Sequence, residues 1–322
     1  MYRVIRSALL LMCGLLVAAC SASDFTTPVT AFSDVTGTAA TSFKSSRESI
    51  EKLATTKRFA LVANGGNIGV DGDDCTPNGK HCRLVVIDKF GKKQPLASPL
   101  DNLQLLMDGL NAYTKGLVNI VKADTAGEVA KGTQAIKTNL SGLAQDADSL
   151  AKATNVKGVS FARASAFIAP VSDAANFAIS KALEAEKVAA LRQATSEMEE
   201  MFPALTKVFE AVNTAAMRHQ RNEIDAAFRK ARDEYRRTRS DSNRTAFVNA
   251  ADAYNAALTS NPKNVFEALR EAHGVLAQSL KSPNPSFTEL FGLLERATEE
   301  ANKLAEINKA FQKARASAST PS

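Results

Sequence analysis

Hydrophobic residues recur at every third or fourth position through most of the chain beyond residue 98, which is the period of an amphipathic α-helix. Helices of globular proteins average about 11 residues, and most of these segments are longer. Long amphipathic helices joined by short breaks bury their apolar faces against antiparallel neighbours. The pattern predicts a mainly all-α fold, an elongated antiparallel bundle. The expected helices run from Ser98 to about 120, over 126–154 and 172–201, from Pro203 to about 235, and over 247–258, 261–281 and 286–311.

The segment 126–154 has the most regular pattern, because its apolar positions alternate steps of four and three residues, the spacing of a coiled-coil seam. Cap signals mark three helix starts: Ser98-Pro99 with Asp101, Asn261-Pro262, and Ser286 with Glu289. Pro203 should end one helix and open the next, because proline breaks the backbone hydrogen-bond pattern. Residues 239–243 are polar enough to form a turn, although an unbroken helix there is the alternative.

A smaller unit precedes the bundle. A helix is expected over 42–63 and should stop at Asn64-Gly65-Gly66, with a strand through residues 58–62 as the alternative. Residues 82–90 form the best strand candidate, and residues 67–70 are its nearest partner. These two segments predict a small β-hairpin.

Cys75 and Cys82 flank a Pro-Asn-Gly turn signal between the two strands, and a disulfide between them would pin the hairpin. The alternative is a metal site formed by both thiols and His81, but no fourth ligand is evident. The acidic run 71–74 lacks the spacing of an EF-hand, so a solvated turn is the better interpretation.

The first twenty residues have the layout of an export signal: Arg3 and Arg6, then an apolar run that ends at Ala19 and is too short to span a bilayer. The sequence Val17-Ala18-Ala19-Cys20 resembles the lipobox of bacterial lipoproteins. This resemblance implies that Cys20 becomes the first residue of the mature chain and receives three acyl chains, including palmitate, which together form a stable membrane anchor. In that family an aspartate after the cysteine retains the protein at the inner membrane, so Ser21 implies the outer membrane, facing the periplasm.

Residues 20–41 are rich in Ser, Thr, Asp and Pro and are expected to form a lipidated flexible tether. The predicted organisation is therefore as follows: signal peptide 1–19, tether 20–41, helix plus disulfide hairpin 42–97, helical bundle 98–315 and disordered tail 316–322.

Charge and composition exclude several classes of function. The net charge is +6, and removal of residues 1–19 takes away two arginines, which leaves a mild excess that does not call for a nucleic-acid partner. The three histidines have no metal-binding spacing, and there is no nucleophile motif, Walker loop or cofactor-binding pattern. The sequence predicts a protein that is not an enzyme and has no metal or cofactor.

Residues 218–244 are the chemically distinctive segment, with eight arginines and one lysine against five acids. Arginine forks match carboxylate and phosphate groups, so Arg232, Arg236, Arg237 and Arg239 are candidates for contact with an anionic envelope polymer or protein. Interleaved acids at helical spacing favour the alternative of a solvated, self-neutralised helix.

Two hypotheses of function follow. The first is a membrane-anchored cell-envelope lipoprotein that acts as a non-enzymatic scaffold or binding protein through its helical bundle. The second is a lipoprotein that binds a small ligand or amphiphile in an apolar slot. The slot would lie near Phe161, Phe167, Ile168 and Phe177.

Overall fold

The computed structural model describes residues 21–71, 83–95, 98–159, 161, 180–259 and 261–318. These residues form mainly helices, with one small antiparallel sheet. The short helix η1 (Ala22–Phe25) leads into α2 (Thr26–Ala63), and the sheet follows. The remaining helices are α3 (Pro99–Val121), α4 (Ala126–Ala153), α5 (Ser180–Thr238), α6 (Asp241–Thr259), α7 (Pro262–Lys281) and α8 (Thr288–Ala318).

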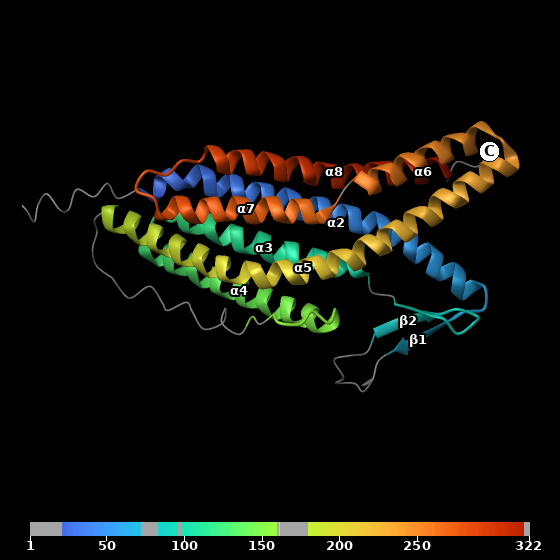
Figure 1. Ribbon diagram of the computed structural model, residues 1–322, viewed down its shortest axis with the longest axis horizontal. Helices are drawn as coiled ribbons and strands as arrows, with labels where there is room; N and C mark the ends of the chain where they lie inside the picture. Colours follow the sequence, from blue (N-terminus) through green and yellow to red (C-terminus); the bar gives the residue numbers. More distant parts are fainter. Residues whose placement is uncertain are drawn as a thin grey trace, which may run out of the picture.

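The helices lie side by side in an elongated bundle (Figure 1). Consecutive helices such as α2 and α3 or α7 and α8 run antiparallel, as predicted, while α2 and α8 pack together in the same direction. Helices α6 and α7 run in succession along the bundle, and α8 packs against both of them. At one end, α5 and α6 extend beyond the bundle body as a helical hairpin, in yellow and orange.

The predicted flexible tether over residues 20–41 is wrong for the described part. Residues 22–25 form η1, and α2 starts at Thr26, far before the expected residue 42. Phe25, Val29 and Phe32 are fully buried, and the same face continues through Thr36. The Thr36 hydroxyl donates to the Phe32 carbonyl at 2.8 Å, so a polar side chain fits within the buried face. The high Ser and Thr content concealed a genuine helical stripe.

Helices α3 and α4 approach closely through glycines. A Cβ on Gly116 of α3 would collide with Ile136 of α4, and a Cβ on Gly132 of α4 would lie 2.9 Å from the side chain of Ile120 of α3. An isoleucine of each helix therefore packs directly against a glycine of the other helix. The predicted coiled-coil stripe of α4 is buried along its whole length at Val129, Thr133, Ile136, Leu140, Leu143, Ala147 and Leu150.

The predicted hairpin is confirmed, with one additional strand. β1 (Asn67–Asp71) pairs antiparallel with β2 (Arg83–Ile87), and β2 also pairs antiparallel with β3 (Lys93–Pro95), which the sequence pattern did not indicate. Helix α2 ends at Ala63, just before Asn64 and Gly65, so the alternative of a strand over 58–62 is wrong. Cys75 and Cys82 lie outside the described residues, so the disulfide stays a prediction.

The predicted helix break at Pro203 is wrong, because α5 is a single helix of 59 residues with Pro203 inside it. Proline offers no N–H, so the Glu199 carbonyl loses its usual donor four residues later. Burial of Met198, Phe202 and Leu205 on both sides of the proline stabilises the continuous helix. In contrast, a helix break is present within 239–243, but it is shorter than predicted: α5 ends at Thr238 and α6 already starts at Asp241.

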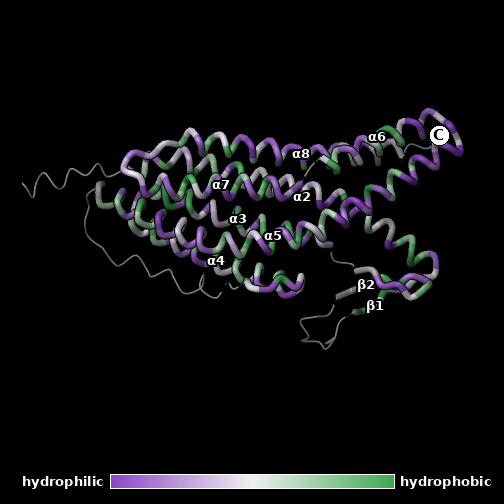
Figure 2. Tube along the Cα trace, in the orientation of Figure 1, coloured by the Kyte–Doolittle hydropathy of each residue, from purple (hydrophilic) through white to green (hydrophobic). Residues whose placement is uncertain are grey.

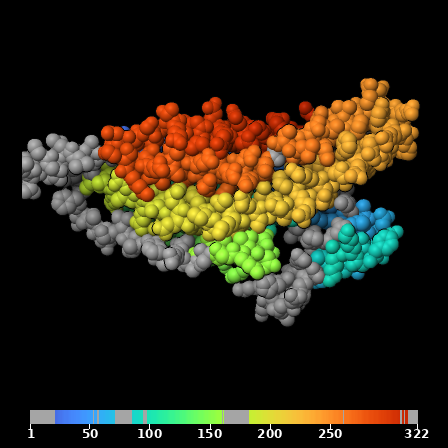
Figure 3. All heavy atoms as spheres, viewed as in Figure 1, coloured from blue at the N-terminus to red at the C-terminus, as the bar shows by residue number. Residues whose placement is uncertain are grey.

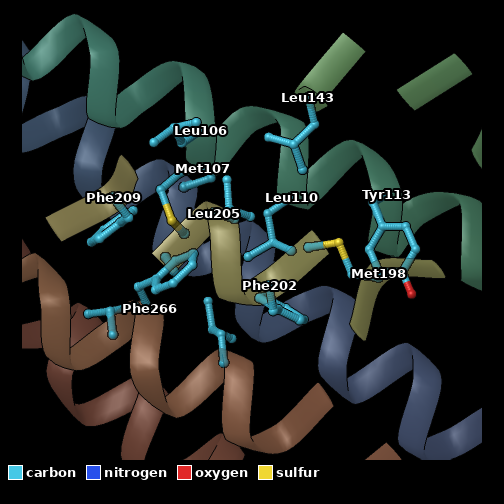
Figure 4. Packing of buried hydrophobic residues seen from close by; sticks show 14 of the residues in the cluster. Leu106, Met107, Leu110, Tyr113, Leu143, Met198, Phe202, Leu205, Phe209 and Phe266 are labelled. Atoms are coloured by element: carbon cyan, nitrogen blue, oxygen red, sulfur yellow. The ribbon is translucent and has the colours of Figure 1, made fainter. Parts of the chain in front are cut away.

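One hydrophobic core runs through the bundle. Figure 4 shows its central part, where Met107 and Leu110 of α3 lie beside Phe202 and Leu205 of α5 and Phe266 of α7. Apolar residues concentrate between the helices, while the projecting α5–α6 hairpin is mostly hydrophilic (Figure 2). None of the described helices contains a stretch that is both long and apolar enough to cross a membrane. Helix α8 reaches Ala318, so residues 316–318 are helical rather than part of a disordered tail, and residues 319–322 lie outside the described part.

Candidate functional site

The predicted arginine cluster lies at the end of the α5–α6 hairpin, which we call the arginine tip (Arg232, Arg236, Arg237 and Arg239). Aromatic rings pack between the two helices of the hairpin, in addition to the contact of α6 with α8. The Tyr235 and Phe247 rings stack with centroids 6.0 Å apart, and Phe228 contacts both Phe247 and Tyr254 at 5.5 Å. These contacts fix the direction in which the tip projects (Figure 3).

The turn at the tip is closed by local hydrogen bonds. Arg239 has the left-handed φ of 50°, and its N–H donates to the Tyr235 carbonyl at 2.8 Å. The Asn243 amide donates to the Thr238 hydroxyl at 2.6 Å, and the Asn243 N–H donates to the Ser240 hydroxyl at 3.3 Å. The arginines are thus presented on an ordered turn.

Two of the four arginines form ion pairs with carboxylates of the same helix, and two do not. Arg232 contacts Asp233 at 2.9 Å, and Arg237 contacts Glu234 at 2.7 Å. The hydrogen bond with Glu234 and its negative charge raise the pKa of Arg237. Arg236 and Arg239 are exposed, and no carboxylate of the described residues lies within ion-pair distance of either. The arginine tip is therefore partly neutralised, and two of its four guanidinium groups form no ion pair among the described residues.

A second polar group, which the sequence analysis did not identify, lies in the core. The ring of His273 on α7 is fully buried, with Nδ1 2.5 Å from a carboxylate oxygen of Glu199 on α5 and Nε2 2.8 Å from the hydroxyl of Tyr113 on α3. The Phe202 ring meets the imidazole edge-on at a centroid distance of 5.0 Å. We call Tyr113, His273 and Glu199 the buried polar chain.

Burial and hydrogen bonding shift all three groups of the buried polar chain. Burial lowers the pKa of His273 and raises that of Tyr113, so the interior favours the neutral form of both. The hydrogen bond from His273 lowers the pKa of Glu199. A neutral imidazole can donate from Nδ1 to Glu199 and accept from Tyr113 at Nε2, which satisfies every partner.

The buried polar chain has the donor order of an acid–base relay, but its position argues for a structural role. Tyr113 is fully buried, so its hydroxyl cannot reach a substrate in this conformation. The chain instead connects α3, α5 and α7 at one level of the bundle. A signal for it existed in the sequence, because His273 falls on the apolar stripe with Leu269 and Leu276.

A third feature is an open groove of about 620 Å³ beside the C-terminal half of α2. It is lined by Arg47, Glu48, Glu51, Lys52, Thr55, Phe59 and Asp101. Burial raises the pKa of Glu51, but hydrogen bonds from His219 and Ser98 and the charge of Arg58 outweigh it, so the net shift is downward. His219 lies 3.2 Å from Glu51. The groove's charges of both signs are largely satisfied by one another, and they define no single ligand.

The other predicted site residues have different outcomes. Cys20, Cys75, Cys82, Phe167, Ile168 and Phe177 lie outside the described residues, so lipidation, the disulfide and most of the apolar slot stay predictions. Phe161 is buried in the hydrophobic core. Among the described residues, no three histidine, cysteine or acidic side chains are grouped so that they could hold a metal ion.

No protein-family model, curated protein or solved structure matches this chain.

Proposed function

We propose that this chain is a lipid-anchored cell-envelope protein without enzymatic chemistry, which acts as a scaffold that presents the arginine tip to an anionic partner. The observation that carries the proposal is the position of the two ends. The described chain starts at one end of the bundle, and the arginine tip lies at the opposite end (Figure 1).

The start of the chain is attached to the bundle by hydrogen bonds. The Ser21 hydroxyl donates to a carboxylate oxygen of Glu184 at 2.7 Å, and the Ser23 N–H donates to the same oxygen at 3.0 Å. Ser21 also caps η1 together with Asp24. An acyl anchor on Cys20 would therefore lie directly against the end of the bundle, with no tether between them.

Helix α5 sets the reach from that end. From Glu184 to Thr238 the helix rises about 80 Å at 1.5 Å per residue. The guanidinium groups of Arg236 and Arg239, which form no ion pair among the described residues, would stand at about that distance from the anchored end of the bundle. Their planar donors suit a carboxylate or phosphate partner, such as an acidic envelope protein or polymer.

Fractionation of cells that carry wild-type chain or Cys20→Ala tests the anchor. We expect wild-type chain in a membrane fraction, with an intact mass that fits cleavage before Cys20 and addition of acyl chains. Cys20→Ala should keep the leader and carry no acyl chain. A wild-type mass with a bare thiol and an attached leader would contradict the proposal.

Cross-linking in the envelope tests the partner. Arg236→Glu/Arg239→Glu should reduce recovery of a defined cross-linked partner by about tenfold or more, because it reverses two contact charges. Lys131→Glu/Lys207→Glu changes two exposed lysines of the bundle body and is the matched control. Equal recovery with both double variants would rule out the arginine tip as the contact.

A further inference from the structure

The turn that joins β2 to β3, residues Asp88–Lys92, has a fixed backbone; we call it the Lys–Phe turn. One carboxylate oxygen of Asp88 accepts from the N–H groups of Phe90 and Lys92, both at 2.9 Å. The Asp88 N–H donates to the Lys92 carbonyl at 3.0 Å, and Gly91 adopts a φ of 81°. The Asp88 carboxylate is held within the turn by these hydrogen bonds and keeps its negative charge, which the two lysines of the turn, Lys89 and Lys92, outnumber.

This ordered turn exposes a large apolar ring. Phe90 is 83% exposed, more than any other large hydrophobic side chain of the described residues. The Lys89 ammonium lies 5.1 Å from the centre of its ring, and Lys92 follows on the other side of Gly91. An ordered turn that exposes a phenylalanine flanked by lysines suits the surface of a bilayer, which has an apolar interior and anionic headgroups.

More apolar surface lies in the same small unit. The pairing of Asn67 with Ile87 places the Lys–Phe turn at the same end of the sheet as the C-terminal end of α2. Phe59, near that end of α2, is 66% exposed, and Ile68 and Val70 on one face of β1 are half exposed. The sheet projects away from the bundle body (Figure 1).

We propose that the Lys–Phe turn docks on an anionic lipid surface, with Phe90 in the interfacial region and Lys89 and Lys92 among the headgroups. Each lysine near an anionic bilayer strengthens partitioning by roughly fivefold. The exposed ring and the lysine ammonium groups of the turn match the apolar interfacial region and the phosphate headgroups of an anionic bilayer. This inference depends only on the turn and is independent of acylation at Cys20.

The chain contains no tryptophan, so Phe90→Trp introduces a single reporter at the turn. The experiment uses the chain from Ser21 onward, which includes every described element and carries no acyl group, with far-ultraviolet circular dichroism as the check of folding. Vesicles of phosphatidylcholine with one-third phosphatidylglycerol should shift the emission of this reporter to the blue, and pure phosphatidylcholine should not. Phe291→Trp, on an exposed position of α8, is the matched control and should show no shift.

Co-sedimentation with the same vesicles separates the two contributions. Phe90→Ser should lower partitioning by about fivefold or more. Lys89→Gln/Lys92→Gln should remove most of the preference for anionic vesicles, whereas Lys131→Gln/Lys207→Gln, on the bundle body, should change it little. Raising ionic strength from about 0.1 M to about 1 M shortens the Debye length from about 10 Å to about 3 Å and should release the chain.

Three results would overturn the proposal. They are an unshifted reporter at position 90 while the chain still sediments, equal shifts at positions 90 and 291, and binding to an acidic polypeptide but not to anionic vesicles. The last result would assign the turn to a protein partner.

Discussion

At the scale of single residues, His273 is the most informative. A fully buried imidazole between a carboxylate and a phenol is stable because each partner has a hydrogen bond to make. The sequence shows that this histidine lies on the apolar stripe of α7, so its burial could be predicted. Its two partners lie 160 and 74 residues away along the chain, and no local pattern connects them.

The buried imidazole predicts a dependence of stability on pH. Burial lowers the pKa of His273 from its ordinary value of 6.5, so below that pH the unfolded chain binds a proton that the folded chain resists. The free energy of unfolding should therefore fall as the pH drops below 6.5, by at most about 1.4 kcal/mol per pH unit for this group. Above pH 6.5 this histidine should contribute no dependence of stability on pH.

Urea denaturation between neutral and mildly acidic pH measures this slope. His273→Gln should reduce the slope on the acid side. Equal slopes in wild type and His273→Gln would show that another group is responsible.

Arg239 carries a backbone conformation that favours glycine. With φ at 50° it occupies the left-handed region just past the end of α5. Arg239→Gly should raise the free energy of unfolding by about 0.5–1 kcal/mol, because glycine adopts this conformation without steric conflict. Arg236→Gly, inside the last turn of α5, should lower it by up to about 1 kcal/mol. Denaturant midpoints compare the two, and a loss of stability in both variants would contradict the prediction.

At the scale of the elements, the sequence predicted what local chemistry determines. The Ser98 cap with Pro99 and Asp101 is confirmed as a capping box, and Asn261 caps α7 as expected. The stop of α2 before Gly65 and the pairing of β1 with β2 were also predictable. Each of these features depends on a few adjacent residues.

The errors arose where packing outweighs local preference. Residues 26–41 looked like a tether by composition, yet their apolar face is covered by other helices, and burial offsets the weak helix propensity of Ser and Thr. Pro203 looked like a stop, yet both flanks of α5 are held in the core. The strand β3 is three residues long and depends entirely on its pairing with β2.

The interlock of α3 and α4 can be tested with two glycines. Gly116→Ala should lower the free energy of unfolding by about 1–3 kcal/mol, because the new methyl group collides with Ile136. Gly142→Ala is the matched control: no atom lies within 4 Å of its added Cβ, so it should gain about 0.5–1 kcal/mol from helix propensity. Urea midpoints report both, and a gain in both variants would mean that the helices can separate freely.

At the scale of the whole molecule, the unbroken α5 predicts a long particle. Small-angle X-ray scattering of the chain from Ser21 onward should give a maximum dimension of at least about 80 Å, the rise of α5 between Glu184 and Thr238. A chain that folded back at Pro203 would be markedly shorter. A smaller maximum dimension would therefore argue against the continuous helix and against the proposed reach of the arginine tip.

The contact between α2 and α8 also has a consequence for biosynthesis. The apolar face of α2 is closed in part by a helix that starts about 225 residues later in the chain. At 5–20 residues per second, the ribosome needs roughly 10–45 s to complete that interval. During this time the nascent chain cannot close its first helix into the native core, so the bundle matures only after synthesis is nearly finished.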